Sequence, residues 1–165
     1  MLDKSETRQK FKEIRKNISD RVAKERIVFE RLFARFGDSK SVFCYQSFGS
    51  EVSTVDIINE FLVRGAKVFI PEIDGKKMML KNIKTGEYSD KPCKLSIVPL
   101  LAFDGDCCRI GYGKGYYDRY LSVNATVSVG IAFAEQYCEN LPKNEQDIPL
   151  SCIITSGIIV ERTKK

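Results

Sequence analysis

One stretch decides the fold: residues 95–134 read "LSIVPLLAFDGDCCRIGYGKGYYDRYLSVNATVSVGIAFA". It opens on an apolar, β-branched run (95–103) that predicts a buried strand, and it closes on a second such run (125–134) that predicts a central strand. Between the two runs lie a glycine-rich segment and a helix that starts at "YYDRYL" (116–121). Strands that alternate with helices in this way indicate an α/β protein with a mainly parallel sheet.

The rest of the chain extends the same pattern. Apolar residues at three-to-four spacing over the first 36 residues predict two helices, with Ser19 as the N-cap between them and Gly37 as a C-cap. A third helix is expected over 52–65, starting at Ser53 or Thr54 and ending at Gly65. Strands are expected at 41–48, at 67–71 closed by Pro71, at 77–83, at 151–155 and at 157–161, and a surface loop at 85–93. The sequence therefore predicts a three-layer α/β/α fold with an N-terminal helical pair.

Bulk composition narrows the class of protein. With 165 residues, the chain is expected to form one domain, 1–165. Hydrophobic residues make up 43% and charged residues 30%, which is ordinary for a soluble globular protein. The net charge of +5 suits anionic small molecules as well as nucleic acid, so it does not argue for a polyanion partner. No apolar run reaches the roughly 18 residues that a membrane span needs.

Cysteine and histidine content restricts the chemistry. No apolar signal segment precedes the six cysteines, so we expect free thiols and a cytoplasmic protein. The sequence has no histidine and no C-x-x-C, which argues against a zinc site and removes Ser-His and Cys-His nucleophiles. Catalysis must then use carboxylates, lysine and arginine, backbone amides and a bound ion.

The segment "RIGYGKGYYDRY" (109–120) has the features of a phosphate-binding loop. Gly111, Gly113 and Gly115 alternate between a strand and a helix, where glycine lets the backbone approach a ligand and the helix start presents free N–H groups. Arg109 and Lys114 add fixed positive charge. The segment matches neither G-x-x-x-x-G-K-[ST] nor the dinucleotide fingerprint.

Structural roles remain open for the same residues. The loop can be a tight turn with solvent-facing charges, and Asp118 can serve the dipole of its helix without any ligand. Tyr116, Tyr117 and Tyr120 can be core packing, and a lysine and an arginine one turn apart in the first helix, Lys4 and Arg8, can be a solvated face.

A longer string narrows these alternatives. "VPLLAFDGDCCRIGYGKGYYDRYL" (98–121) resembles the signature of the 5-formyltetrahydrofolate cyclo-ligase family, also called 5,10-methenyltetrahydrofolate synthetases. "KSETR" (4–8), "YQSFGSEVSTVDII" (45–58), "AFAEQ" (132–136) and "LPKNEQDIPLSCIIT" (141–155) are similar to further parts of the family in the same order. The resemblance spans nearly the whole chain.

The resemblance implies an enzyme that uses ATP as co-substrate and Mg²⁺ to cyclise 5-formyltetrahydrofolate to 5,10-methenyltetrahydrofolate. It implies reduced folate and ATP as partners, no nucleic acid or membrane, and a monomer or weak homodimer. Two alternatives stay open: a relative that binds nucleotide or folate without catalysis, and a sugar-phosphate isomerase of similar architecture.

The resemblance also implies roles for individual residues. The ATP-binding residues are Lys4, Arg8, Arg109, Ile110, Gly111, Tyr112, Gly113, Lys114, Gly115, Tyr116 and Tyr117, of which Arg109 and Lys114 are catalytic. The substrate-binding residues are Gln46, Glu51 and Tyr116, and the magnesium ligands are Asp118 and Asp147. Gln146 stands where many relatives carry histidine, Ser151 where they often carry an acid, and Gln46 where an apolar residue is usual.

Overall fold

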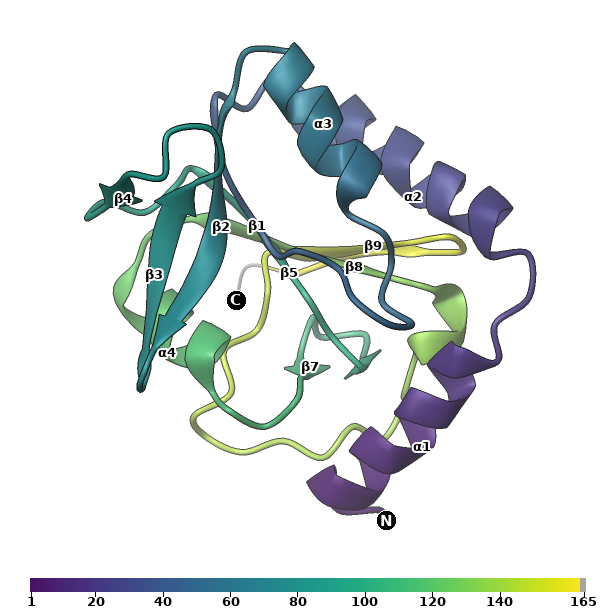
Figure 1. The fold of residues 1–165 in the computed structure, drawn as a ribbon. Helices are drawn as coiled ribbons and strands as arrows, with labels where there is room; N and C mark the ends of the chain where they lie inside the picture. Colours follow the sequence, from purple (N-terminus) through teal and green to yellow (C-terminus); the bar gives the residue numbers. More distant parts are fainter. Residues whose placement is uncertain (164–165) are drawn as a thin grey trace.

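A sheet of eight strands forms the middle of the molecule in the computed structural model (Figure 1). The structure describes residues 1–163, so the last two residues of the predicted domain 1–165 lie outside the described residues. In chain order the strands are β1 (Ser41–Cys44), β2 (Lys67–Asp74), β3 (Lys77–Asn82), β4 (Tyr88–Ser89), β5 (Leu95–Val98), β8 (Val127–Ala132), β9 (Cys152–Thr155) and β10 (Ile159–Glu161). Their order across the sheet is β10-β9-β8-β5-β1-β2-β3-β4.

The middle of this sheet is parallel and its edges are antiparallel. β9, β8, β5, β1 and β2 pair in parallel, while β10 adds to one side and β3 and β4 to the other in antiparallel fashion. Every residue of β5 and β9 is buried, as expected for strands covered on both faces. The prediction of a mainly parallel sheet is confirmed, and both edge strands, β4 and β10, are only two and three residues long.

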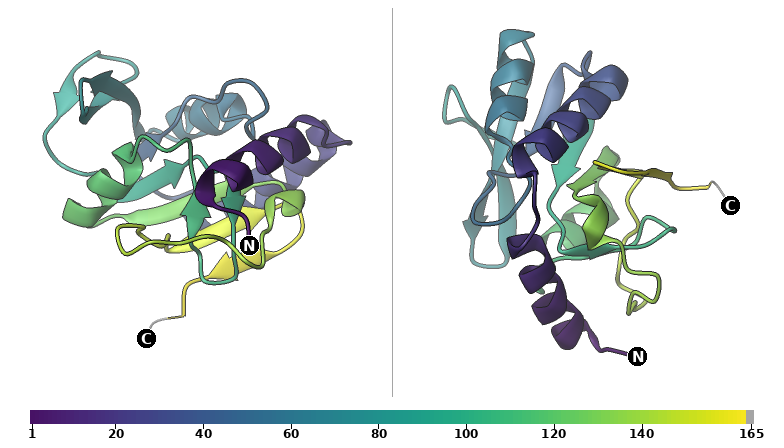
Figure 2. Two further views of the ribbon diagram at one scale, coloured as in Figure 1. Left: turned by 90° about the horizontal axis from the view of Figure 1, so that it is seen from below. Right: turned by 90° about the vertical axis from the view of Figure 1, so that its right-hand side faces the viewer.

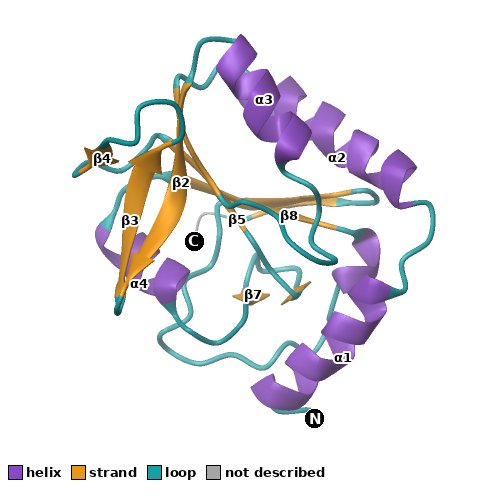
Figure 3. Cartoon of the chain, viewed as in Figure 1, coloured by secondary structure: helices purple, strands orange, loops and turns teal. Residues whose placement is uncertain are grey.

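Helices cover both faces of the sheet (Figure 3). On one face lie α2 (Arg21–Phe36) and α3 (Val55–Val63), whose Leu32 and Phe61 pack in one cluster with Ile97 of β5. On the other face lie α4 (Tyr116–Val123) and a small hairpin of β6 (Ala102–Phe103) and β7 (Arg109–Ile110). Tyr120 of α4 packs against Phe43 of β1 on this side. The three-layer prediction is confirmed.

The first helix, α1 (Lys4–Lys16), lies beyond the end of the sheet rather than over a face (Figure 2). Its Phe11 packs with Leu101, Ala102 and Ile110 around the β6–β7 hairpin, and the helix also contacts the short helix η1 (Ala134–Gln136). Within residues 1–163, no helix combines the length and the apolar character that a membrane crossing requires.

Several predicted boundaries were wrong. The strand expected at 41–48 ends at Cys44, and the one expected to close at Pro71 continues to Asp74. The pairing of β2 with β1 stops at Phe69, so Pro71 pairs only with Leu80 of β3. A proline without an N–H group is tolerated on such an open side of a strand. Two short strands, β4 and β7, lie where loops were expected.

The helix boundaries agree more closely. α2 ends at the predicted C-cap Gly37, but its N-cap is Asp20, with φ 52°, and not Ser19. Thr54 is the N-cap of α3, as one of the two predicted alternatives. Its backbone N–H donates to Ser47 Oγ at 3.0 Å, and the N–H of Ser47 donates to Thr54 Oγ1 at 2.9 Å. This exchange fixes the loop between β1 and α3.

Candidate active site

The glycine-rich loop joins β7 to α4 along a path that favours glycine. Gly113 has φ 95° and Gly115, the N-cap of α4, has φ 71°, in the left-handed region that side chains rarely enter. Space is short as well, because a Cβ at Gly113 would lie 3.1 Å from Arg8 Cζ, and one at Gly115 would lie 2.7 Å from Arg119 Nη1. Two guanidinium groups therefore pack against the loop backbone.

A cavity of about 710 Å³ opens beside this loop. Its walls come from three distant parts of the chain: the start of α1, the glycine loop with the first turns of α4, and the segment 144–148 before β9. Pro99, directly after β5, is also part of the wall, so the cavity lies at the carboxyl end of a parallel strand. The structure thus brings together all the residues predicted for ATP and magnesium: Lys4, Arg8, Arg109, Ile110, Gly111, Tyr112, Gly113, Lys114, Gly115, Tyr116, Tyr117, Asp118 and Asp147.

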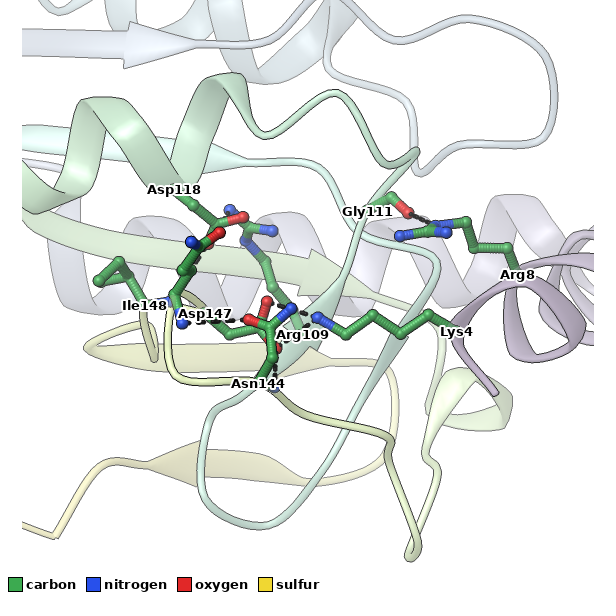
Figure 4. Close-up of polar contacts among 9 residues, drawn as sticks. Lys4, Arg8, Arg109, Gly111, Asp118, Asn144, Asp147 and Ile148 are labelled. Carbon is green, nitrogen blue, oxygen red and sulfur yellow. Dashed lines mark hydrogen bonds and ion pairs between the residues drawn. The ribbon is translucent and has the colours of Figure 1, made fainter. Parts of the chain in front are cut away.

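Two cations reach the cavity from α1 (Figure 4). Lys4 Nζ lies 2.6 Å and 2.7 Å from the two carboxylate oxygens of Asp147, and Arg8 Nε donates to the carbonyl oxygen of Gly111 at 3.0 Å. The helix that carries both begins with a capping box, in which Asp3 and Glu6 exchange side-chain and backbone hydrogen bonds. The rigid start of α1 therefore holds Lys4 and Arg8 against the glycine loop.

Arg109 is the buried cation of the cavity. Its side chain is 4% exposed, its Nη2 lies 3.3 Å from Asp118 Oδ1, and its guanidinium stands over the ring of Tyr117. Its Nε is buried without a hydrogen-bond partner in the described part of the chain. Burial lowers the pKa of Arg109 from its ordinary value, while Asp118 acts in the opposite direction. A buried donor without a partner is costly, so Arg109 suits a ligand that supplies an acceptor.

The two predicted magnesium ligands both carry structural hydrogen bonds. Asp118 lies in the first turn of α4 and accepts from the N–H of Ile148 at 3.2 Å. Asp147 accepts from the N–H of Asn144 at 2.8 Å, which closes a turn. Within residues 1–163 no three histidine, cysteine or acidic side chains gather as a metal cluster. A cation held by these two carboxylates would therefore take further oxygen ligands from a substrate or water.

Two of the three predicted substrate residues, Glu51 and Gln46, do not line this cavity. Glu51 is buried, accepts from the N–H of Phe48 at 2.9 Å, and accepts from the hydroxyl of Tyr112 at 3.2 Å. Burial raises the pKa of Glu51 above its ordinary value. Gln46 is exposed on the loop after β1 and does not line the cavity. Tyr116 does line it, and its hydroxyl donates to the carbonyl oxygen of Gly75 at 2.9 Å.

Sequence reasoning missed Arg15, which joins these two regions. Arg15 is 3% exposed and donates to Ser50 Oγ at 3.0 Å, to the carbonyl oxygen of Leu100 at 3.0 Å, and to the Tyr112 hydroxyl at 2.5 Å. Since Tyr112 in turn donates to Glu51, one chain of hydrogen bonds connects α1, the glycine loop and the β1–α3 loop. The spacing of Arg15 from Arg8, two helical turns, is the signal that would have found it.

Two of the three positions that depart from the family pattern, Gln146 and Ser151, differ in their relation to the cavity. Gln146 lines the cavity, whereas Ser151 lies outside it. Ser151 Oγ accepts from the backbone N–H of Ser128 at 3.0 Å, where β8 and β9 begin. Ser151 is therefore part of the sheet's hydrogen bonding, and only Gln146 is placed to affect the surroundings of Asp147.

The fold and the cavity together define an α/β protein with a cationic, glycine-rich pocket at the carboxyl end of a parallel strand, where open α/β sheets bind ligands. The profile of the 5-formyltetrahydrofolate cyclo-ligase family matches residues 1–96 and 82–156. The chain belongs to this family, whose members are ligases that carry out the ATP-dependent cyclisation of 5-formyltetrahydrofolate.

Individual relatives agree with this assignment. A probable 5-formyltetrahydrofolate cyclo-ligase of Caenorhabditis elegans is 29% identical over 191 residues, covering 93% of each chain. A 5-formyltetrahydrofolate cyclo-ligase of Mycoplasma genitalium is 33% identical over 122 residues, covering 72% of this chain and 73% of the relative. The solved structure of a 5,10-methenyltetrahydrofolate synthetase from Mycoplasma pneumoniae has a TM-score of 0.84 at 25% identity, covering 94% of this chain and 99% of that one. Family membership overturns the sugar-phosphate isomerase alternative.

Proposed function

We propose that this protein catalyses the cyclisation of 5-formyltetrahydrofolate to 5,10-methenyltetrahydrofolate with conversion of ATP to ADP and phosphate. One observation carries the proposal: lysine and arginine side chains from α1 and from the glycine loop converge with two aspartates on a single cavity. The charges suit a polyphosphate. The absence of histidine from the sequence suits a reaction that needs no protein nucleophile.

The chemistry follows from the substrate. The formyl group on the ring nitrogen is an amide, and resonance makes its carbon a poor electrophile. In the proposed first step, the formyl oxygen forms a bond to the γ-phosphorus of ATP while the bond to the leaving ADP breaks. In the second step, the other folate nitrogen attacks the formyl carbon and loses its proton. That attack closes the ring, and phosphate then departs with the former formyl oxygen, which leaves the methenyl carbon double-bonded between the two nitrogens.

The protein's task in this scheme is to position the reactants and to neutralise charge. Arg109 offers a buried Nε that has no hydrogen-bond partner among residues 1–163, in a setting where a charged hydrogen bond is stronger than in water. Lys114 is exposed on the loop and makes no hydrogen bond or ion pair to residues 1–163, so its ammonium group is available to phosphate oxygens. Lys4 and Arg8 complete the cationic wall from α1.

Asp118 and Asp147 fit a magnesium site, because Mg²⁺ takes one or two protein carboxylates and fills its other positions with phosphate oxygens and water. A bound Mg²⁺ supplies neutralisation of the charge that develops on the transferred phosphoryl group. Without it, the same carboxylates pair with Lys4 and Arg109, which keeps the negative charge compensated inside the cavity.

We assign the folate side to the region around Glu51, Gln46 and Tyr116. Glu51 is held by Phe48 and by the Arg15–Tyr112 chain of hydrogen bonds, and its raised pKa makes its protonated form easier to reach. An ionised carboxylate can accept hydrogen bonds from the amino group of a pterin ring, and a protonated carboxyl group can also donate one to its carbonyl oxygen. We infer a monomer or weak homodimer, because residues of one chain form the cationic and acidic walls of the cavity. The six free cysteines favour a reducing compartment such as the cytoplasm.

The test is to mix the protein with ATP, Mg²⁺ and 5-formyltetrahydrofolate and to follow the near-ultraviolet absorbance of the methenyl product. The expected result is product formation that needs both ATP and Mg²⁺ and releases one ADP per methenyl group. Binding of ATP or folate without product would instead identify a non-catalytic relative. ATP hydrolysis without product would exclude the proposed coupling.

A further inference from the structure

Arg119 is a cation of the cavity to which neither the glycine-loop motif nor the family resemblance gives a role. It lies on α4, one turn after Gly115, and its side chain is exposed at the cavity wall. Its backbone N–H donates to the carbonyl oxygen of Gly115 at 3.1 Å, so the helix fixes its main chain relative to the loop.

Three contacts hold its guanidinium between the glycine loop and the β2–β3 hairpin. Arg119 Cζ stands 5.1 Å from the centre of the Tyr116 ring, and Nη2 donates to the carbonyl oxygen of Lys76 at 3.4 Å, at the tip of the β2–β3 hairpin. Nη1 occupies the space that a Cβ at Gly115 would need. The Tyr116 hydroxyl reaches the same hairpin tip, at Gly75. The side chain is thus turned back along α4 toward the loop, as helical side chains tend to be.

Arg119 differs from two other cations of the cavity, which form ion pairs. Lys4 pairs with Asp147, and Arg109 pairs with Asp118. Arg119 forms no ion pair with any residue in the range that the structure describes, and its single hydrogen bond to a carbonyl oxygen is long. A guanidinium has five N–H donors in a planar fork that matches phosphate, so most of these donors stay available.

We propose that Arg119 binds the phosphate chain of the nucleotide, with the ring of Tyr116 and the backbone of Gly115 holding its guanidinium in place. The inference rests on the proposed function and adds a phosphate-binding residue to it. The Gly115 position then has two purposes: it permits the positive φ at the start of α4, and it leaves room for the guanidinium that faces the phosphates.

The chain offers a matched control in Arg64. Its guanidinium also stands over an aromatic ring, 4.8 Å from the centre of Phe33, and also fills the space of a missing Cβ, at Gly37. It pairs with Glu60 and does not line the cavity. An alanine substitution at either position removes one positive charge and one ring contact from the protein surface.

The experiment measures binding of ATP and of inorganic triphosphate by calorimetry to the unaltered protein, Arg119→Ala, Arg119→Lys and Arg64→Ala. Arg119→Ala should weaken both ligands about tenfold, the low end for a charge-assisted hydrogen bond. Arg119→Lys should recover part of the loss, and Arg64→Ala should bind as the unaltered protein does. Circular dichroism and a melting temperature check that each variant is folded.

Several results would overturn the inference. Unchanged binding to Arg119→Ala, or an equal loss in Arg64→Ala, would remove the specific phosphate contact. A loss for ATP with none for triphosphate would place Arg119 against the nucleoside instead. These outcomes leave the proposed function standing, because the unaltered protein still binds ATP. Failure of the unaltered protein to bind either ligand would overturn both proposals together.

Discussion

Replacing Asp147 by asparagine tests whether its carboxylate binds a metal ion or only stabilises the fold. In the structure Asp147 has two structural partners, the Lys4 ammonium at 2.6 Å and the N–H of Asn144 at 2.8 Å. Asparagine keeps one carbonyl oxygen, so it preserves the turn at Asn144 while removing the charge that Lys4 and a cation would share. The substitution therefore removes the ion pair with Lys4 whether Asp147 binds a metal or only stabilises the fold. Only if Asp147 binds Mg²⁺ should the substitution also change the Mg²⁺ requirement.

The cost of losing the ion pair depends on how exposed the two side chains are. The side chains of Lys4 and Asp147 are 25% and 17% exposed, so their ion pair is partly screened and contributes about 1 kcal/mol to the free energy of unfolding. For a domain of this size, such a loss lowers the melting temperature by roughly 2–4 °C. If Asp147 also holds Mg²⁺, the Mg²⁺ concentration for half-maximal activity should rise by about tenfold or more, since even outer-shell changes cost 10–100-fold in metal affinity.

The assay is methenyl formation at saturating ATP over a range of Mg²⁺ concentrations, with melting temperatures measured in parallel. Glu60→Gln is the control, because it breaks the Arg64 ion pair on the surface and should leave the Mg²⁺ requirement unchanged. Asp118→Asn should raise the requirement too, and the double variant should lose less than the two single losses combined. A melting temperature that falls with an unchanged Mg²⁺ requirement would refute the shared ion.

Four further predictions concern three other residues. Lys114→Ala should slow turnover 10²–10³-fold, which corresponds to roughly 3 kcal/mol in the activation free energy. Its melting temperature should change little, because Lys114 has no hydrogen bond or ion pair to residues 1–163. Assays of methenyl formation measure the first effect, and scanning calorimetry measures the second. Glu51→Gln should raise the KM for folate and leave the affinity for ATP nearly unchanged. An equal weakening of folate and ATP binding would contradict this prediction. Because burial raises the pKa of Glu51, the folded protein should lose stability as pH rises from about 4.5 through that raised pKa. The glutamine variant should lack this loss in melting curves across that range. Cys138, the one cysteine among residues 1–163 that is not buried, should react first with a thiol reagent, and Cys138→Ser should remove the fast phase in a thiol titration.

Local sequence features predicted the glycine loop and the helix face that form part of the cavity wall. Alternating glycines between a strand and a helix start indicated a loop with special backbone angles, and the structure has positive φ at Gly113 and Gly115. The four-residue spacing of Lys4 and Arg8 placed both on one face of a helix, and both line the cavity. These inferences succeed because each depends on residues within one or two turns of each other.

Contacts between distant segments could not be predicted in the same way. Arg15 contacts Tyr112, and through it Glu51, only because α1 packs on the β6–β7 hairpin, and that packing is set by the whole fold. The continuation of β2 through Pro71 has the same origin, since it depends on how far β1 extends beside it. The roles of Gln46 and Glu51 stay predictions, because no contact in the structure reports on a bound folate.

The two short antiparallel edges of the sheet have a consequence for self-association. A long, flat, apolar strand at a sheet edge offers its free N–H and C=O groups to another molecule, which promotes aggregation. Here all four residues of β9 are buried and three of them are apolar, and β10, which ends in Glu161, pairs along its outer side. Removing residues after Thr155 would leave β9 as a short but mostly apolar edge with unpaired N–H and C=O groups. We therefore expect that truncation to yield aggregates of an otherwise folded core, visible by light scattering.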